Sequence, residues 1–256
     1  RLSLDIVAGA DPEAPGAWRL DLPDENRTRL GDFRIAVITN DAAYPVDSDT
    51  SAALENVAQH LEDEGATVRR DPAMPMPSDA LWLLYLTVLR GATSGRLSDA
   101  QAAEIAWKAA EFDADDMNYD PVQFRSLSQR HQAWLHACDR REELRSLWRT
   151  FFGDVDALIT PMMATAAFPH MRDLRRQDQY LDVNGTQRPN ADTYYWIGLA
   201  SAAHLPSTLA PAGMSNDGLP IGMQIIGPEA RDRRCIRLAV LLEESFRGFT
   251  PPPGYD

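Results

Sequence analysis

The sequence predicts an α/β fold in which a mixed β-sheet is covered by helices. A strand, a helix and a second strand follow one another with short joints between residues 33 and 70, which is typical of a parallel βαβ unit. Two apolar strands separated by a turn rich in Gly, Asn and Asp follow between residues 205 and 228, which is typical of a hairpin. A sheet that contains both units has parallel and antiparallel neighbours.

The βαβ unit begins with the apolar strand FRIAVIT, Phe33–Thr39. Residues 48–50 offer N-caps for a helix that reaches Glu64, and Ala66–Arg70 resumes as a strand. No Gly-rich turn joins the first strand to the helix, which argues against a Rossmann-type nucleotide site. The apolar residues of the helix share one face, as helical spacing requires: Leu54, Val57, Ala58 and Leu61.

Three helical stretches follow. Ser78–Arg90 is apolar nearly all round, so we expect it to be buried, beside a cavity. Ser98–Glu111 is expected to turn a stripe of apolar residues inward, and Pro121–Phe152 has helical spacing throughout, as one long helix or two in line. The inward stripe consists of Leu97, Ala102, Ile105 and Ala109.

The remaining elements lie before the βαβ unit and after residue 152. A helix ending at Gly9 and a Pro-rich acidic connector open it, and residues 172–192 are expected to form a polar surface excursion. One strand of the hairpin is too apolar to face water, so we expect it inside a sheet covered on both faces. The other predicted elements are the buried strand Asp156–Pro161, a helix over Thr193–Ala203, hairpin strands at Ser207–Ala212 and Gly222–Ile226, and a last helix, Arg233–Phe246, capped by Asp232.

Composition excludes several classes of function. The 256 residues have a net charge of −13, which argues against nucleic acids and anionic membranes as partners. No apolar run is long enough to span a bilayer. The two cysteines, Cys138 and Cys235, fall on predicted helices, so we expect free thiols and a cytoplasmic location. Asp113–Asp120 superficially resembles a calcium loop but lacks the Gly of the bend and the final Glu, so we expect no metal and no cofactor.

Three segments carry a resemblance to a known family: LPSTLAPAG…DGLPIGMQIIGP in the hairpin, LSLDIVAGADPEAP at the start, and FFGDVDALITPMMATAAFP between them. Together they resemble the amidase signature family, serine hydrolases that cleave carboxamides. The resemblance covers nearly the whole chain but only the second half of the usual family length. It implies that residues 1–256 are the C-terminal portion of a single amidase domain whose N-terminal half is missing. The abrupt start at Arg1 fits this interpretation.

The family uses a Ser–Ser–Lys arrangement that precedes, in family order, everything in this chain. We therefore expect no catalytic residue here. The single lysine, Lys108, lies between Glu104 and Glu111 at the spacing of a surface ion pair. No G-x-S-x-G motif is present, and Ser201 and Ser207 fall in stretches that the family uses for structure.

Each of the five histidines is a candidate partner for a serine. We expect His60 and His136 to face solvent and His131 to be a hydrogen-bonded core residue. His170 and His204, in loop or helix-end positions, are the better candidates, but neither is assigned a catalytic role. No Cys, His and Asp cluster has the spacing of a metal site.

What the resemblance assigns to this half is the substrate pocket. The candidates for its lining are Met74, Trp82, Tyr85, Thr193, Tyr195 and Trp196, with Tyr194 beside them; ordinary core packing is an equally open interpretation. The expected substrate is a small-molecule amide. The segment QAWLHACDRREELRSL replaces the Gly- and Tyr-rich segment of the tRNA-linked branch, which disfavours that branch. A homodimer is possible. The alternative function is a non-catalytic accessory or binding subunit derived from an amidase.

Overall fold

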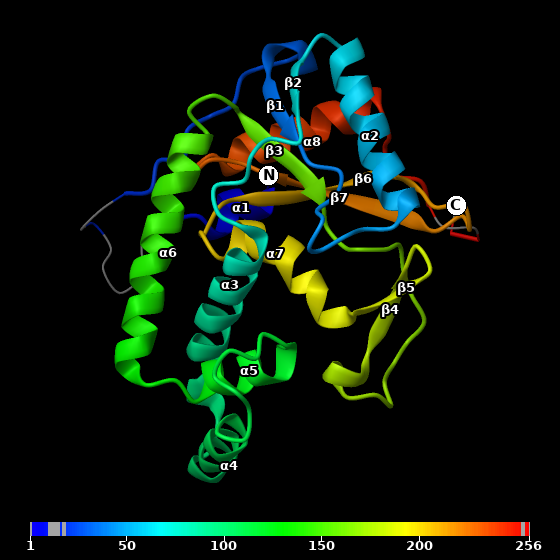
Figure 1. Ribbon diagram of the computed structural model, residues 1–256. Helices are drawn as coiled ribbons and strands as arrows, with labels where there is room; N and C mark the ends of the chain where they lie inside the picture. The colour runs from blue at the N-terminus through cyan, green and yellow to red at the C-terminus, as the bar shows by residue number, and fades with distance from the viewer. Residues whose placement is uncertain (1, 10–15, 17–18, 252–253, 256) are drawn as a thin grey trace.

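A computed structural model describes residues 2–9, 16, 19–251 and 254–255 (Figure 1). Its main sheet has five strands in the order β2-β1-β3-β7-β6. β1 runs parallel to β2 and to β3, whereas β7 is antiparallel to both β3 and β6. The mixed sheet predicted from the sequence is thereby confirmed. Its strands are β1 (Arg34–Val37), β2 (Thr67–Arg70), β3 (Ala157–Pro161), β6 (Ser207–Met214) and β7 (Pro220–Ile226).

Helices cover both faces of this sheet, as the apolar character of β3 and β7 requires (Figure 1). Alternate residues of β3 point to opposite faces: Ala157 and Ile159 belong to one core cluster and Leu158 to the other. The first cluster packs against α2 (Ser48–Asp63) and α8 (Asp232–Ser245). The second packs against α3 (Ser78–Thr93), α6 (His131–Phe151) and α7 (Thr193–Ser201). The short helices α1 (Leu2–Val7), α4 (Asp99–Ala109) and α5 (Tyr119–Leu127) complete the α-helices of the described residues.

Two predicted helix starts are wrong by one residue. The cap of α2 is Asp47, whose carboxylate accepts a hydrogen bond from the backbone N–H of Thr50 at 2.7 Å. Residues 48–50 therefore belong to the first turn. The last helix begins at Asp232 itself, and the residue before it, Arg231, makes no side-chain capping bond.

The inward face predicted for the helix around residues 98–111 is also wrong. α4 has no buried residue, and Ala102 is exposed. The helix projects from the body and packs chiefly on α5, so its apolar residues are covered only in part (Figure 1).

Of the two alternatives predicted for residues 121–152, one long helix or two, the structure has two helices, separated at residues 128–130. The break allows α6 to run against α3, where the side chain of Trp134 occupies the space beside Gly91. A Cβ at Gly91 would lie 2.2 Å from that indole. Glycine is therefore the residue that permits this contact.

The excursion at 172–192 contains a small hairpin that was not predicted from the sequence. β4 (Tyr180–Val183) and β5 (Thr186–Pro189) pair antiparallel, and Asn184 and Gly185 between them both have positive φ, 55° and 81°. Asn-Gly is the pair that a two-residue hairpin turn favours. The Asn184 side chain accepts a hydrogen bond from the N–H of Ser48 at 2.8 Å and donates one to the carbonyl of Val46 at 3.2 Å. The small hairpin is therefore tied to the start of α2.

β6 forms one edge of the sheet and carries an irregularity. Its register against β7 shifts between Pro211 and Gly213, as in a β-bulge. The opposite edge is β2, which ends with Arg69 and Arg70.

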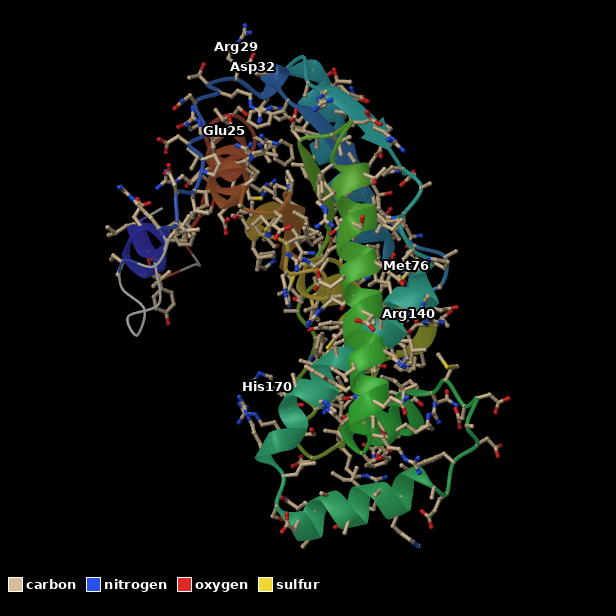
Figure 2. The ribbon with its side chains drawn as sticks, turned by 90° about the vertical axis from the view of Figure 1, so that its left-hand side faces the viewer. Glu25, Arg29, Asp32, Met76, Arg140 and His170 are labelled. Carbon is tan, nitrogen blue, oxygen red and sulfur yellow. The ribbon has the colours of Figure 1, made fainter. Side chains whose placement is uncertain are left out.

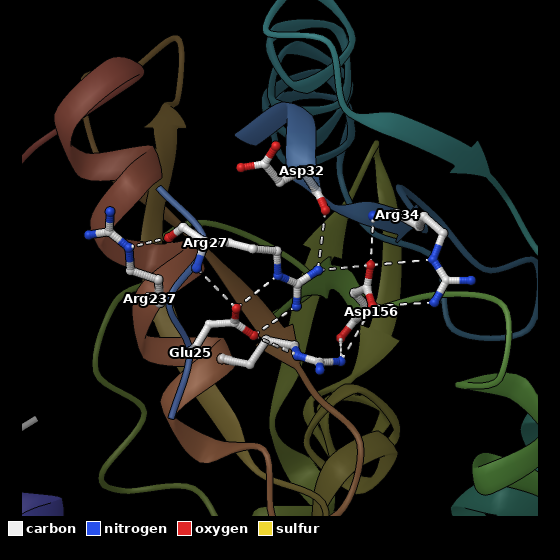
Figure 3. A network of polar contacts seen from close by, with 7 residues as sticks. Glu25, Arg27, Asp32, Arg34, Asp156 and Arg237 are labelled. Atoms are coloured by element: carbon white, nitrogen blue, oxygen red, sulfur yellow. Dashed lines mark hydrogen bonds and ion pairs between the residues drawn. The ribbon is translucent and has the colours of Figure 1, made fainter. Parts of the chain in front are cut away.

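A polar network, which we call the Asp156 network, joins the amino ends of β1 and β3 to α8 (Figure 3). The Asp156 carboxylate accepts a hydrogen bond from the N–H of Arg34 at 2.9 Å and pairs with the guanidinium of Arg27 at 3.1 Å. Arg27 also pairs with Glu25 at 2.7 Å, and Glu25 pairs with Arg234 of α8 at 3.0 Å. The connector at residues 25–27 is thus fixed against the sheet and the last helix.

Because of this network, the free energy of unfolding falls at low pH. The hydrogen bond from Arg27 lowers the pKa of Glu25 to about 2. Because the folded pKa lies below the unfolded value of about 4.3, the stabilisation is present above that value and is lost as pH falls toward 2. We expect Glu25→Gln to flatten the fall of the urea-unfolding free energy between about pH 5 and pH 2. Exposed Glu111→Gln is the matched control; equal pH slopes in the two variants would contradict the prediction.

Candidate functional site

Among the described residues, two cavities lie where the parallel strands β1 and β3 end. Ligands in open α/β sheets bind at the carboxyl ends of strands, beside a change in strand order or direction. Here β3 has parallel β1 on one side and antiparallel β7 on the other, so such a change lies at its carboxyl end. The loops that leave β1 and β3 meet there with the beginning of β7.

Two adjoining cavities open at this edge. The first, which we call the β3 groove, has a volume of about 230 Å³ and lies between the loop after β3, the first turn of α2 and the start of β7. The second, which we call the acidic hollow, has a volume of about 390 Å³ and shares residues 165–168 with the groove. The residues that line the β3 groove are Thr50, Met162, Met163, Thr165, Ala166, Ala167, Phe168, Pro220, Ile221 and Gly222.

The two cavities differ in chemistry. The β3 groove is mainly apolar, with two methionines, a phenylalanine and an isoleucine in its walls. The acidic hollow is bounded by four carboxylates on three separate segments, and β4 of the small hairpin forms part of its wall. Those carboxylates belong to Asp47, Asp49, Asp182 and Asp217. Among the residues that the structure describes, no Lys, Arg or His lines either cavity.

The six residues predicted for the pocket lie in the part of the core that faces α3, α6 and α7. Five are buried, with Tyr195 and Trp196 each 1% exposed, while Met74 is half-buried against the same core cluster. None of the six lines the β3 groove or the acidic hollow. The five buried ones are Trp82, Tyr85, Thr193, Tyr195 and Trp196.

Tyr195 belongs to a hydrogen-bonded cluster around Asp41, in the loop that follows β1. The Asp41 carboxylate accepts hydrogen bonds from the hydroxyls of Ser78 at 2.6 Å and Tyr195 at 2.9 Å. It also accepts from the N–H of Ala43 at 2.8 Å, and the ring of Tyr44 stacks on Tyr195 with the ring centroids 4.6 Å apart. Burial raises the pKa of Tyr195 above its ordinary value. This cluster fixes the loop after β1 onto α3 and α7.

Tyr194 lies beside a different set of side chains. It is half-buried, its ring stacks on Tyr119 at 5.8 Å, and the guanidinium of Arg176 lies over it at 5.1 Å. Burial raises its pKa, but the charges of Arg176 and Arg90 outweigh that effect, so the net shift is downward.

The candidate side chains for catalysis are dispersed. Lys108 pairs with Glu104 at 2.6 Å on the surface of α4, as predicted, and Ser207 donates to Gln224 at 3.0 Å. The core position predicted for His131 is wrong, because the break before α6 places this residue at an exposed helix start. His170 is exposed, and in Figure 2 it lies far from Arg29 and Asp32 at the opposite end of the molecule.

The remaining histidines have no described serine and carboxylate arranged with them as a triad. His204 is exposed, with φ of 56°, and partial burial together with nearby arginines lowers its pKa. His60 contacts the ring of Phe246 at 4.9 Å and bonds the Ser245 hydroxyl at 3.0 Å. Within the described residues no group of His, Cys, Asp and Glu could hold a metal ion, and no helix could cross a membrane.

The residues of the β3 groove were not among the predicted pocket residues, because Met162–Phe168 reads as an irregular loop. A signal exists in the sequence: the apolar run PMMATAAF continues directly beyond a strand that is buried at every position. Apolar side chains past the end of such a strand have no sheet to cover them.

Comparisons with known proteins agree across the chain. A sequence model of the protein family described as Amidase matches residues 1–236. A glutamyl-tRNA(Gln) amidotransferase subunit from Ruegeria pomeroyi is 26% identical over 98% of this chain and 53% of its own length. Indoleacetamide hydrolase of Bradyrhizobium japonicum is 24% identical over 95% of this chain and 49% of its own length. Acylamidase of Rhodococcus erythropolis is 24% identical over 94% of this chain and 49% of its own length. The chain thus spans about half the length of these relatives.

Solved structures show the same fold. A glutamyl-tRNA(Gln) amidotransferase subunit from Thermotoga maritima superposes with a TM-score of 0.68 at 18% identity, over 100% of this chain and 53% of the other. A structure of 6-aminohexanoate cyclic dimer hydrolase complexed with substrate gives a TM-score of 0.64 at 20% identity, over 94% of this chain and 52% of the other. At these identities the likeness supports the fold alone.

The burial of Trp196 generates a prediction about stability. We expect Trp196→Ala to lower the free energy of unfolding by about 3–5 kcal/mol, because it removes a fully buried indole from a packed cluster. Trp107→Ala is the control, since Trp107 is 64% exposed on α4 and should cost less than about 0.5 kcal/mol. Urea denaturation measures both. A Trp196→Ala loss as small as the control's would indicate that Trp196 lines an open cavity.

Proposed function

The chain belongs to the amidase family, and from this premise we propose that it is the pocket-forming part of an enzyme that hydrolyses the carbon–nitrogen bond of carboxamides. The observation that carries the proposal is the family match over residues 1–236, in a chain that spans about half of its relatives. The substrate cavity would include the β3 groove, at the edge of the sheet where α/β proteins bind ligands.

We further propose that the reaction uses a serine nucleophile which lies outside these 256 residues. Amide hydrolysis needs an activated nucleophile, a base and donors for the oxyanion. A lysine can serve as the base only when it is neutral, which requires burial. Lys108 is instead a half-buried residue on the surface of α4, paired with Glu104, so we do not assign it this role. A Ser–Ser–Lys set supplied by an N-terminal half, as the family resemblance implies, would complete the site.

The substrate we propose is a small-molecule amide, as the names of the acylamidase and the indoleacetamide hydrolase among the relatives suggest, and not an amide-forming step on tRNA. The net charge of −13 supports this choice, because binding a polyphosphate backbone depends on basic surface. We place the enzyme in the cytoplasm, which is consistent with the free thiols of Cys138 and Cys235.

The proposal predicts that the 256-residue chain does not hydrolyse an aryl amide such as 4-nitroacetanilide. Its absorbance trace should match the buffer blank, and Lys108→Ala should change nothing. Co-expression with the coding sequence directly upstream, if that sequence encodes a lysine followed by a Gly- and Ser-rich segment, should produce turnover. Activity of the chain alone that disappears in Lys108→Ala or His170→Ala would show that the chemistry is misplaced. An upstream sequence without such residues would favour a non-catalytic accessory subunit.

A further inference from the structure

We propose, resting on the function above, that the β3 groove is a specificity subsite for an uncharged apolar group of the amide substrate, with the buried Thr50 hydroxyl as its hydrogen-bonding group. An aryl ring that carries a hydroxyl is the chemistry that fits. Three observations support this inference: the walls of the groove, the missing partner of Thr50, and the charge of the adjoining hollow.

The walls of the groove leave apolar side chains incompletely covered. Met162, Met163 and Phe168 are each half-buried beyond the end of a strand whose own residues are all buried. Ile221 of β7 closes the base. Methionine side chains are flexible and polarisable, and they make favourable contacts with aromatic rings. The cavity of about 230 Å³ is large enough for a single ring and too small for a nucleotide.

Thr50 is the buried polar residue of this wall. It is 1% exposed, and its hydroxyl has no hydrogen-bond partner among the described residues. A helical threonine ordinarily donates to a carbonyl three or four residues earlier. Here the carbonyl of Val46 accepts from the side chain of Asn184, and that of Asp47 accepts from the N–H of Ser51. Each of these carbonyls thus has another donor, and the hydroxyl of Thr50 bonds neither of them.

An unpaired buried hydroxyl is costly, so a ligand atom that pairs with it gains more than the same atom would gain in water. The Thr50 side chain already lines the groove. Rotation about its Cα–Cβ bond exchanges the hydroxyl and the methyl group among staggered positions. The hydroxyl can therefore meet a donor or an acceptor on a ring seated between the methionines.

The adjoining acidic hollow selects the charge of the ligand. Four carboxylates border it and none of the described basic side chains lines either cavity, so an anionic group entering the groove meets only like charge. These carboxylates are also held in place by the fold. Asp49, for example, accepts two hydrogen bonds from Asn216 at 2.7 and 2.6 Å. The hollow therefore excludes an anionic group, and the apolar walls of the groove disfavour burial of a charge of either sign.

The test measures binding to the 256-residue chain, so it does not require turnover. Dissociation constants for 4-hydroxybenzamide, benzamide and 4-carboxybenzamide are measured by titration in ¹H–¹⁵N NMR, following the backbone amides of Thr50 and Gly222. We expect 4-carboxybenzamide to bind at least about tenfold more weakly than 4-hydroxybenzamide at low salt. We expect Thr50→Val to weaken 4-hydroxybenzamide about three- to tenfold and to leave benzamide unchanged.

Thr87→Val is the matched control, because its hydroxyl is satisfied by the carbonyl of Leu83 at 2.8 Å within α3. It should leave all three constants unchanged. Thr50→Val should keep or raise the melting temperature, since it removes an unpaired polar group. Any of three results would overturn the inference: no saturable shift with 4-hydroxybenzamide, equal affinity for the charged probe, or a melting temperature lowered as if an internal hydrogen bond had been lost. Failure of the amidase proposal would leave these binding results intact, so the two failures are distinguishable.

Discussion

The complete burial of β3 constrains the rest of the molecule. All five of its residues are buried, its two edges are occupied by β1 and β7, and its two faces are covered by helices. Only the ends of such a strand can approach solvent. At the amino end, the Asp156 network fixes the neighbouring backbone to α8. At the carboxyl end the Asp41 cluster holds the loop after β1, whereas β3 passes into the apolar loop that forms the β3 groove. The Asp156 network and the β3 groove thus lie at opposite ends of the same strand.

The helices that cover this strand are joined to it by buried polar contacts as well as by packing. Gln224 of β7 is 4% exposed, donates to the carbonyl of Trp196 in α7 at 3.2 Å and accepts from the Ser207 hydroxyl. Because each polar group of a buried amide must find a partner, these bonds fix the position of α7 relative to the sheet. The Asp41 cluster adds a second connection, between the loop after β1 and the same helix. Together they explain why Tyr195 and Trp196, predicted to line a pocket, are fully buried between α7 and the sheet.

Local patterns in the sequence predicted the elements that depend on local physics. The apolar runs of β1, β3 and β7 and the face of α2 follow from periodicity alone. The predictions that were wrong concern features that depend on tertiary contacts. His131 stands at helical spacing from the apolar residues Leu127 and Trp134, but the chain breaks at residues 128–130, so His131 starts a helix. Three polar residues at the start of α2 were all plausible caps, yet Asp47, one residue earlier, provides it. The Asn-Gly turn of the small hairpin was recognisable but stood in a polar segment. The unpaired hydroxyl of Thr50 was not predictable, because helical spacing does not show whether a buried hydroxyl finds a partner.

The two outer strands of the sheet have a consequence for how this protein associates with other copies. An uncovered strand can accept a foreign strand through its free N–H and C=O groups, which is a common route to sheet extension and fibrous aggregation. On one side β6 carries Pro211, which has no N–H to offer, and the register shift beside it bends the strand away from regular pairing. On the other side β2 ends with Arg69 and with Arg70, whose guanidinium pairs with Glu55 and Glu62. Charged side chains along an edge strand disfavour pairing with a second strand. Both outer strands of the described sheet thus carry features that work against its extension by a second copy.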